Sequence, residues 1–267
     1  GHGRGEMFLG SDAIALAPFT SEITYLVDGD WAVIGRDGAF IFDVDGNRVE
    51  RPRQVSSAAA YLIDKGNHRH FMEKEIYEQP EVVGHTLAHY LDFAAGRSAL
   101  PEDAGIDFAA LDRLSITACG TAYYAGLVGK YWFERFARLP VDIDIASEFR
   151  YREQPLAPGG LSIVVSQSGE TADTLASLRY ARSQGQQVAA VVNVRESTIA
   201  RESDVVLPTL AGPEIGVAST KAFTCQLSTL LALALAAGKA RGHVSADDEA
   251  RLVRAMSEVP RLMSAAL

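Results

Sequence analysis

The feature that most constrains this chain is a repeated order of apolar strand, small-residue loop and helix in its second half. The segments SITACG, LSIVVSQSG and QQVAAVVNV each lead into a helical pattern. Val and Ile run through them with little polar alternation, which is typical of strands covered by helices on both faces. With VDIDIA and DVVLPTL as two further short strands, the sequence predicts an α/β domain built on a parallel sheet.

The first part of the chain has a different character. From Glu22 to Arg51, short apolar runs alternate with the turn sequences DGD, RDG and DVDGN. Asp-Gly turns between Val, Ile, Phe and Tyr predict antiparallel hairpins. The polar, small-residue segment that follows, up to His70, breaks the strand pattern and is interpreted as an interdomain linker.

Helical patterns lie on either side of the predicted sheet. Apolar residues recur at helical spacing from Phe71 to about residue 92, where Pro80 is positioned to begin a new helix, so two helices joined near Gln79 are expected. The segment from Ser219 to Leu267 is also expected to be helical, with a break before Ser245, which can cap the final helix.

Charge and composition exclude several classes of protein. The formal charge of -9 argues against a nucleic-acid partner, because binding to a duplex needs clustered Lys and Arg. The most apolar stretch, Leu227 to Ala237, is shorter than a membrane span and is expected to be a buried helix. Only Cys119 and Cys225 occur, and no secretory leader opens the chain, so a cytoplasmic location without a membrane partner is expected.

Two polar loops follow predicted strands and are the candidate ligand site. One is Cys119-Gly120-Thr121, and the other is the hexapeptide SQSGET at residues 166–171. The hexapeptide brings three hydroxyl groups, a permissive glycine and the start of a helix together, which suits a phosphate dianion. The simpler interpretation is helix capping, but one hydroxyl would suffice for that.

Nucleotide-binding and metal motifs do not fit. The chain contains no G-x-x-x-x-G-K-[ST], and no G-x-G-x-x-G follows a strand. The pairs His68/His70 and His85/His89 have no grouped further ligands, so no metal site is predicted.

Two residues of the chain, a cysteine and a lysine, are candidate catalytic groups by residue type. Cys119 precedes a helix and could be acidified, yet no histidine partner is apparent. Lys221 is interpreted as part of a helix start. Both are expected to be structural.

A family resemblance makes these expectations specific. The segments ACGTAYYAG, ASEFRYR, SQSGETADTL, RESDVVL and EIGVASTKAFTCQ, in this order, resemble the first sugar isomerase (SIS) domain of the glutamine:fructose-6-phosphate amidotransferases, also called glucosamine-6-phosphate synthases. Upstream, GRGEMFLGSDAIAL and the hairpins resemble the end of that family's N-terminal nucleophile glutaminase domain. HRHFMEKEIYEQP resembles its entry into the isomerase half.

The resemblance implies a domain order. Residues 1–55 would be the C-terminal part of the glutaminase domain, and 56–70 an interdomain linker. Residues 71–245 would be the first SIS domain with its entry helices, and 246–267 a helix that leads towards a second SIS domain.

The resemblance also implies roles for particular residues. The phosphate grip falls on residues of both loops: Thr121, Ser166, Gln167, Ser168 and Thr171. Val217 and Ser219 would line the sugar side of the pocket. The position after Thr121 carries a hydroxyl in many members of the family and is Ala122 here.

The implied activity is that of the whole enzyme, a glutamine-dependent aminotransferase that converts fructose 6-phosphate to glucosamine 6-phosphate in hexosamine biosynthesis, without a metal or organic cofactor. This chain would supply sugar-phosphate binding and be catalytically incomplete, because the glutaminase nucleophile and the acid/base residues are expected elsewhere. A homodimer is implied. The alternatives are a non-catalytic SIS module that senses a sugar phosphate, or a complete SIS isomerase or deglycase.

Overall fold

Five parallel strands form the central sheet of the larger of two structural units. The computed structural model describes residues 1–10, 13–36, 38–56, 64–101 and 104–267, and it divides into units of residues 1–67 and 68–267. Across the sheet the strands are, in order, β12 (Val205–Pro208), β11 (Gln187–Val192), β10 (Leu161–Ser166), β8 (Leu114–Ala118) and β9 (Val141–Ile145). All neighbouring strands are parallel, which confirms the predicted sheet.

The strand order reverses between β8 and β10. The chain passes from β8 to β9 on one side, returns to β10 on the other side of β8, and then continues to β11 and β12. Loops that leave two adjacent strands in opposite directions open a crevice at the carboxyl ends of those strands. The loops after β8 and β10 therefore flank the position where such folds bind ligands.

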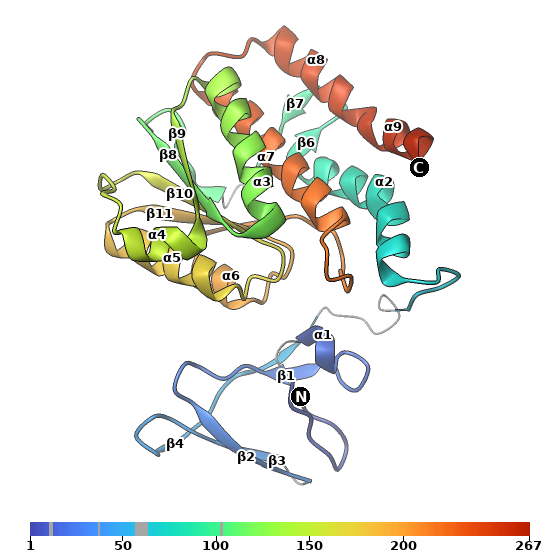
Figure 1. Cartoon of the computed structure of the whole chain (residues 1–267), viewed down its shortest axis with the longest axis vertical. Helices are drawn as coiled ribbons and strands as arrows, with labels where there is room; N and C mark the ends of the chain where they lie inside the picture. The colour runs from blue at the N-terminus through green and yellow to red at the C-terminus, as the bar shows by residue number, and fades with distance from the viewer. Residues whose placement is uncertain (11–12, 37, 57–63, 102–103) are drawn as a thin grey trace. The chain divides into compact units, whose positions relative to one another are not determined.

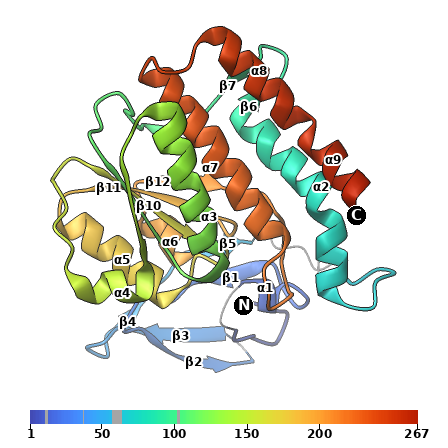
Figure 2. The same ribbon diagram turned by 45° about the horizontal axis from the view of Figure 1, so that its top comes forward.

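Helices cover both faces of the sheet (Figures 1 and 2). On one face lie α3 (Gly120–Trp132) and α7 (Lys221–Ala240), and on the other lie α4 (Ala146–Arg152), α5 (Ala172–Ser183) and α6 (Thr198–Glu202). Alternate residues of β10 enter two separate cores: Ile163 and Val165 join the core with α3 and α7, whereas Val164 packs with Leu178 of α5. Burial of both faces explains the unbroken apolar pattern of the strands.

Helix α7 is the core helix that the apolar stretch at 227–237 predicts. By length and composition alone it could cross a membrane, but 67% of its apolar window is buried inside the unit. It packs against α2 and α3. Its hydrophobicity is therefore explained by packing within this fold.

Helix α2 corrects the prediction of two helices near Gln79. It runs without a break from Phe71 to Tyr90 with Pro80 inside it. Proline has no N–H to bond the carbonyl four residues earlier, which here belongs to Ile76. The side-chain amide of Gln79 donates to that same oxygen at 3.0 Å, so the helix continues through the proline.

The C-terminal segment also differs in detail from the prediction. Ser245 caps α8 (Ala246–Ser257), as expected, by accepting a hydrogen bond from the Asp248 N–H at 3.1 Å. A further helix, α9 (Val259–Ala266), then begins with proline in its first turn. The expected single final helix is therefore two, and Pro260 explains the break because it cannot donate to the preceding turn.

Smaller elements complete this unit. After α2 comes a short hairpin of β6 (Leu91–Asp92) and β7 (Arg97–Ser98). Helix α3 continues into a π-helical turn, Phe133–Ala137. That turn buries Phe133 completely, because it packs into the core shared with α7.

The smaller unit is antiparallel, as its Asp-Gly turns predict. Strands β2 (Trp31–Gly35), β3 (Gly38–Phe42) and β4 (Arg48–Val49) form one sheet, and β1 (Glu22–Thr24) pairs with β5 (Arg53–Val55). A short helix, α1 (Ala13–Leu16), precedes them. Residues 57–63 of the predicted linker lie outside the described residues.

One turn of the smaller unit shows why its sequence forms hairpins. The Asp43 carboxylate accepts from the N–H groups of Asp45 and Asn47 at 3.0 and 2.9 Å. This local bonding closes the DVDGN turn between β3 and β4.

Candidate functional site

The SQSGET loop, residues 166–171, leaves the carboxyl end of β10 and enters α5. Ser166 is buried, and its hydroxyl oxygen accepts from the Gly169 N–H at 3.0 Å and lies 3.1 Å from the Thr171 hydroxyl. The Ser168 hydroxyl accepts from the Glu170 N–H at 3.2 Å. Ser166 thus organises the loop from inside, while Ser168 and Thr171 remain partly exposed at its surface.

Gly169 is required by the backbone of this loop. Its φ of +67° lies in the left-handed region, and a Cβ there would be 1.9 Å from the Ser197 hydroxyl oxygen. The Gly169 carbonyl also accepts from the Ile199 N–H of α6 at 3.0 Å. The loop is therefore packed directly on the segment after β11, with no room for a side chain.

The second predicted loop lies beside the first. Strands β8 and β10 are in register, with Ala118 opposite Val165, so Cys119, Gly120 and Thr121 lie next to the start of the SQSGET loop. Thr121 is exposed in the first turn of α3, whereas Ala122 is 7% exposed and faces the core. The structure therefore brings the two predicted loops together at one edge of the sheet.

The N-terminus of α5 supplies the positive end of this site. The N–H groups of a first helical turn have no acceptor within the helix, and together with the helix dipole they favour an anion. Asp173 in this turn would oppose an anion, but its carboxylate is paired with Arg150 at 2.7 Å. The Glu170 carboxylate accepts from the Thr198 N–H at 2.7 Å, and so is directed to the start of α6.

Asn193, which follows β11, joins the SQSGET loop to the segment after β12. Its N–H donates to the Gln167 carbonyl at 3.2 Å. Its side-chain amide donates to the Gly212 carbonyl at 2.7 Å and accepts from the Ala211 N–H at 2.9 Å. Three consecutive loops at the carboxyl edge of the sheet are thereby linked.

Val217 and Ser219 lie on the segment of residues 212–220, which we call the 212–220 loop. Val217 is fully exposed, and the Ser219 hydroxyl donates to Glu214 Oε2 at 2.9 Å. Glu214 Oε1 also accepts from the N–H groups of Thr220 and Ala222 at 2.8 and 3.1 Å, which caps the start of α7. The two residues are thus held at the same sheet edge as the SQSGET loop, on a separate and internally bonded segment.

Sequence reasoning missed three residues that shape this edge. The position of Asn193 in the sequence could have marked it as a site residue, because it directly follows an apolar strand, just as the SQSGET loop follows β10. Glu214 precedes a predicted helix start, where a carboxylate is favoured. Glu75 gave no local indication, because its partners are about 140 residues away, at Ile215 and Gly216.

Two further residues with reactive side chains, Cys225 and Lys221, are buried. Cys225 is buried, and this burial raises the pKa of its thiol to about 12. Lys221 begins α7, is 4% exposed, and pairs with Glu78 at 2.7 Å. Within the described parts of the chain, no three His, Cys, Asp or Glu side chains gather as a metal site.

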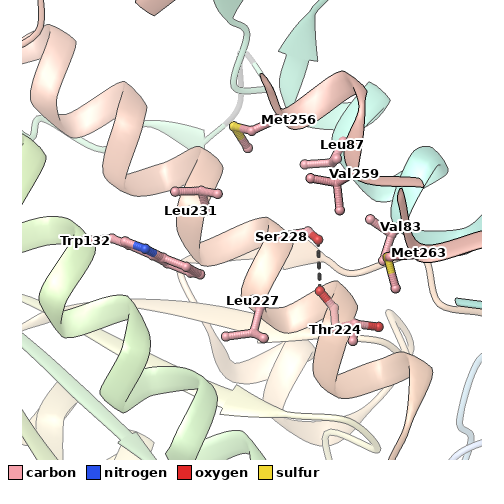
Figure 3. A pocket seen from close by; sticks show the side chains of 10 residues that line it. All are labelled: Val83, Leu87, Trp132, Thr224, Leu227, Ser228, Leu231, Met256, Val259 and Met263. Atoms are coloured by element: carbon pink, nitrogen blue, oxygen red, sulfur yellow. Dashed lines mark hydrogen bonds between the residues drawn. The ribbon is translucent and has the colours of Figure 1, made fainter. Parts of the chain in front are cut away.

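A pocket of about 190 Å³ lies elsewhere, between helices of the larger unit (Figure 3). Its apolar lining comes from α2, α3, α7, α8 and α9: Val83, Leu87, Trp132, Leu227, Leu231, Met256, Val259 and Met263. The two hydroxyl groups at its wall, Thr224 and Ser228, donate to carbonyls of their own helix. This pocket has no group suited to a phosphate.

Comparison with known proteins gives a family and close relatives. The model of the SIS domain matches residues 108–236, which include both candidate loops. Glutamine–fructose-6-phosphate aminotransferase (isomerizing) of Rhizobium meliloti is 69% identical over the whole of this chain. The protein of the same name from Mesorhizobium japonicum is 70% identical over 98% of the chain.

A solved structure agrees with the sequence comparisons. The C-terminal domain of glucosamine-fructose-6-phosphate aminotransferase from Francisella tularensis matches 74% of this chain and 56% of its own, with 41% identity and a TM-score of 0.71. The chain spans 44% of the length of its Rhizobium relative.

Proposed function

Because the chain belongs to the glutamine–fructose-6-phosphate aminotransferase family, we propose that its SQSGET loop, together with Thr121, anchors the phosphate of fructose 6-phosphate. The SIS domain matched within the chain suits sugar-phosphate binding. The resemblance in the sequence motifs is thereby confirmed, and the alternative of a non-catalytic sensor module is not favoured.

The observation that carries this proposal is the packing of the SQSGET loop at the strand reversal. A buried hydroxyl, Ser166, and a left-handed glycine, Gly169, shape the loop, and Ser168 and Thr171 are partly exposed on it just before α5. Gln167 is partly exposed between them. Hydroxyl and N–H donors that converge on one point bind a phosphate dianion without a basic side chain.

For the parent enzyme we propose the reaction that the relatives' name describes. Glutamine supplies nitrogen to C2 of fructose 6-phosphate, and a proton moves between C1 and C2 to give glucosamine 6-phosphate and glutamate. This chain contributes the phosphate anchor, whose binding energy holds the reacting carbons in place. The nucleophile for glutamine and the acid/base groups belong, in this proposal, to other parts of the enzyme.

The domain limits are part of the same proposal. Residues 1–55 supply the end of the glutaminase domain, 56–70 the linker, 71–245 the first SIS domain, and 246–267 the way to a second SIS domain. The antiparallel sheets of the smaller unit and the parallel sheet of the larger unit support this division.

Replacement of Ser168 by Ala tests the proposed anchor. We expect fructose 6-phosphate binding to weaken by about 1–3 kcal/mol, the usual range for a hydrogen bond to a charged group. Calorimetry with the purified chain measures it. Ser183→Ala is the control, because Ser183 is an exposed serine at the far end of α5. Equal affinity of Ser168→Ala and the unchanged chain would contradict the assignment.

We also propose that the chain forms a cytoplasmic homodimer. Four aromatic residues lie at the end of α3 and in the π-helical turn after it. The structure buries Phe133, packs Trp132 and Phe136 against the core, and leaves Tyr131 63% exposed. Three of these four aromatic side chains therefore pack within one subunit and do not need a second subunit to cover them. Exposed apolar residues of the 212–220 loop and of the neighbouring α2 give better support: Ile215, Val217 and Met72.

Sedimentation at micromolar concentration tests the dimer. We expect a two-fold dimer. A Val217→Ser variant should associate more weakly, because less apolar surface is then buried between the subunits and the free energy of association becomes less favourable. A strictly monomeric profile, with and without fructose 6-phosphate, would remove this proposal.

A further inference from the structure

A buried carboxylate of α2, that of Glu75, binds the backbone of the 212–220 loop. Glu75 is 2% exposed, and its Oε1 accepts from the N–H groups of Ile215 and Gly216 at 2.5 and 3.0 Å. Its Oε2 lies 3.2 Å from the same Gly216 nitrogen. These bonds join two backbone groups of the loop to a helix about 140 residues earlier in the chain.

The approach of Glu75 to this loop leaves no free space. A Cβ at position 216 would be 2.5 Å from Glu75 Oε2 and 3.5 Å from the Cα of Met72. The glycine therefore allows the backbone to meet the carboxylate directly. This close approach fixes the loop one residue before Val217.

The cost of burying this group argues for a role beyond packing. A carboxylate loses its hydration when it is buried, and hydrogen bonds must replace that hydration. The loop does not need Glu75 for its own closure, since Glu214 already bonds the backbone at Thr220 and Ala222. The two carboxylates hold opposite ends of one short segment, and Val217 and Ser219 lie between those ends.

We propose that Glu75 is a positioning residue for sugar recognition. It fixes Ile215 and Gly216 so that Val217 and Ser219 face the sugar part of a ligand whose phosphate lies in the SQSGET loop. This inference rests on the proposed function. It assigns no contact between Glu75 and the substrate. Replacement of Glu75 should therefore weaken recognition of the sugar and leave the affinity for phosphate unchanged.

The test compares two ligands in the same variants. Fructose 6-phosphate reports on both parts of the site, and inorganic phosphate reports on the anchor alone. In Glu75→Ala we expect the preference for fructose 6-phosphate over phosphate to fall about tenfold or more, with phosphate affinity within about twofold of the unchanged chain. Glu75→Gln keeps one oxygen acceptor and should show an intermediate loss.

Glu249→Ala is a matched control. Glu249 is 4% exposed and also accepts from a backbone N–H, that of Ser98 at 2.9 Å, but it lies on α8. Loss of this second buried carboxylate should lower stability and leave the preference between the two ligands unchanged. Amide exchange at Ile215 and Gly216 should accelerate in Glu75→Ala and not in Glu249→Ala.

Each outcome decides between the claims. Faster exchange at Ile215 and Gly216 together with lost sugar preference supports the inference. Unchanged exchange, or faster exchange with the preference retained, overturns it. If the unchanged chain binds neither ligand, the proposed function fails and the inference fails with it. If it binds phosphate and fructose 6-phosphate with equal affinity, the phosphate anchor stands and the inference alone fails.

Discussion

Replacement of Gly169 by Ala should destabilise the larger unit and abolish sugar-phosphate binding. The residue has a φ of +67°, which costs an L-residue about 1–2 kcal/mol. The new Cβ would also lie 1.9 Å from Oγ and 2.4 Å from Cβ of Ser197, and overpacking of this kind costs about 1–3 kcal/mol. We expect a combined loss of about 2–5 kcal/mol in urea unfolding, with no binding of fructose 6-phosphate measurable by calorimetry.

Two variants separate the causes of this loss. Gly159 has a φ of +80° and no atom within 4 Å of a Cβ, so Gly159→Ala carries only the backbone cost and should bind normally. Combination of Gly169→Ala with Ser197→Gly removes the clash and should recover part of the stability. Wild-type binding by Gly169→Ala alone would show that the loop does not need its observed conformation.

Much of the fold could be predicted because its causes are local. The unalternating runs in β8, β10 and β11 reflect burial on both faces, and each is followed directly by the loop that ends it. The SQSGET loop combines strand end, glycine and helix start within six residues. Such a site can be found from sequence because neighbours in the chain are also neighbours in space.

The prediction of a break in α2 was wrong because a side chain makes the hydrogen bond that proline cannot make. Proline inside α2 predicts a break, but Gln79 satisfies the carbonyl that Pro80 leaves without a donor. The sequence contains both residues, yet the hydrogen bond depends on the conformation of one side chain. At the end of α8, the proline did end the helix, as the same rule predicts.

The support around the candidate site could not be predicted, because it joins distant segments. Glu75 contacts a loop that follows the last strand, and nothing in the sequence around Glu75 marks it as buried. Its neighbour one turn along α2, Glu78, makes the second such link, to Lys221 at the start of α7. Two successive turns of one helix thus fix the entry to the core helix and the loop before it.

The second link predicts a large loss of stability in Glu78→Ala. Lys221 is 4% exposed and lies in the first turn of α7, where the helix dipole disfavours a positive charge. Without Glu78 the buried ammonium has lost its carboxylate partner, and removal of one partner from a buried pair costs about 3–5 kcal/mol. The Glu78 side chain is 28% exposed, so water lessens the loss, and we expect a decrease of about 3 kcal/mol in the free energy of unfolding.

A double-mutant cycle distinguishes the loss of a partner from the loss of packing. Lys221→Met keeps most of the side-chain volume and removes the charge, so Glu78→Ala should cost little when it is made in that background. Lys74, which lies 3.4 Å from Glu78 on the same helix, stays in all four proteins and so does not affect the comparison. If Glu78→Ala costs the same with and without Lys221, the two residues are not coupled, and the start of α7 is held by the Glu214 cap and by packing instead.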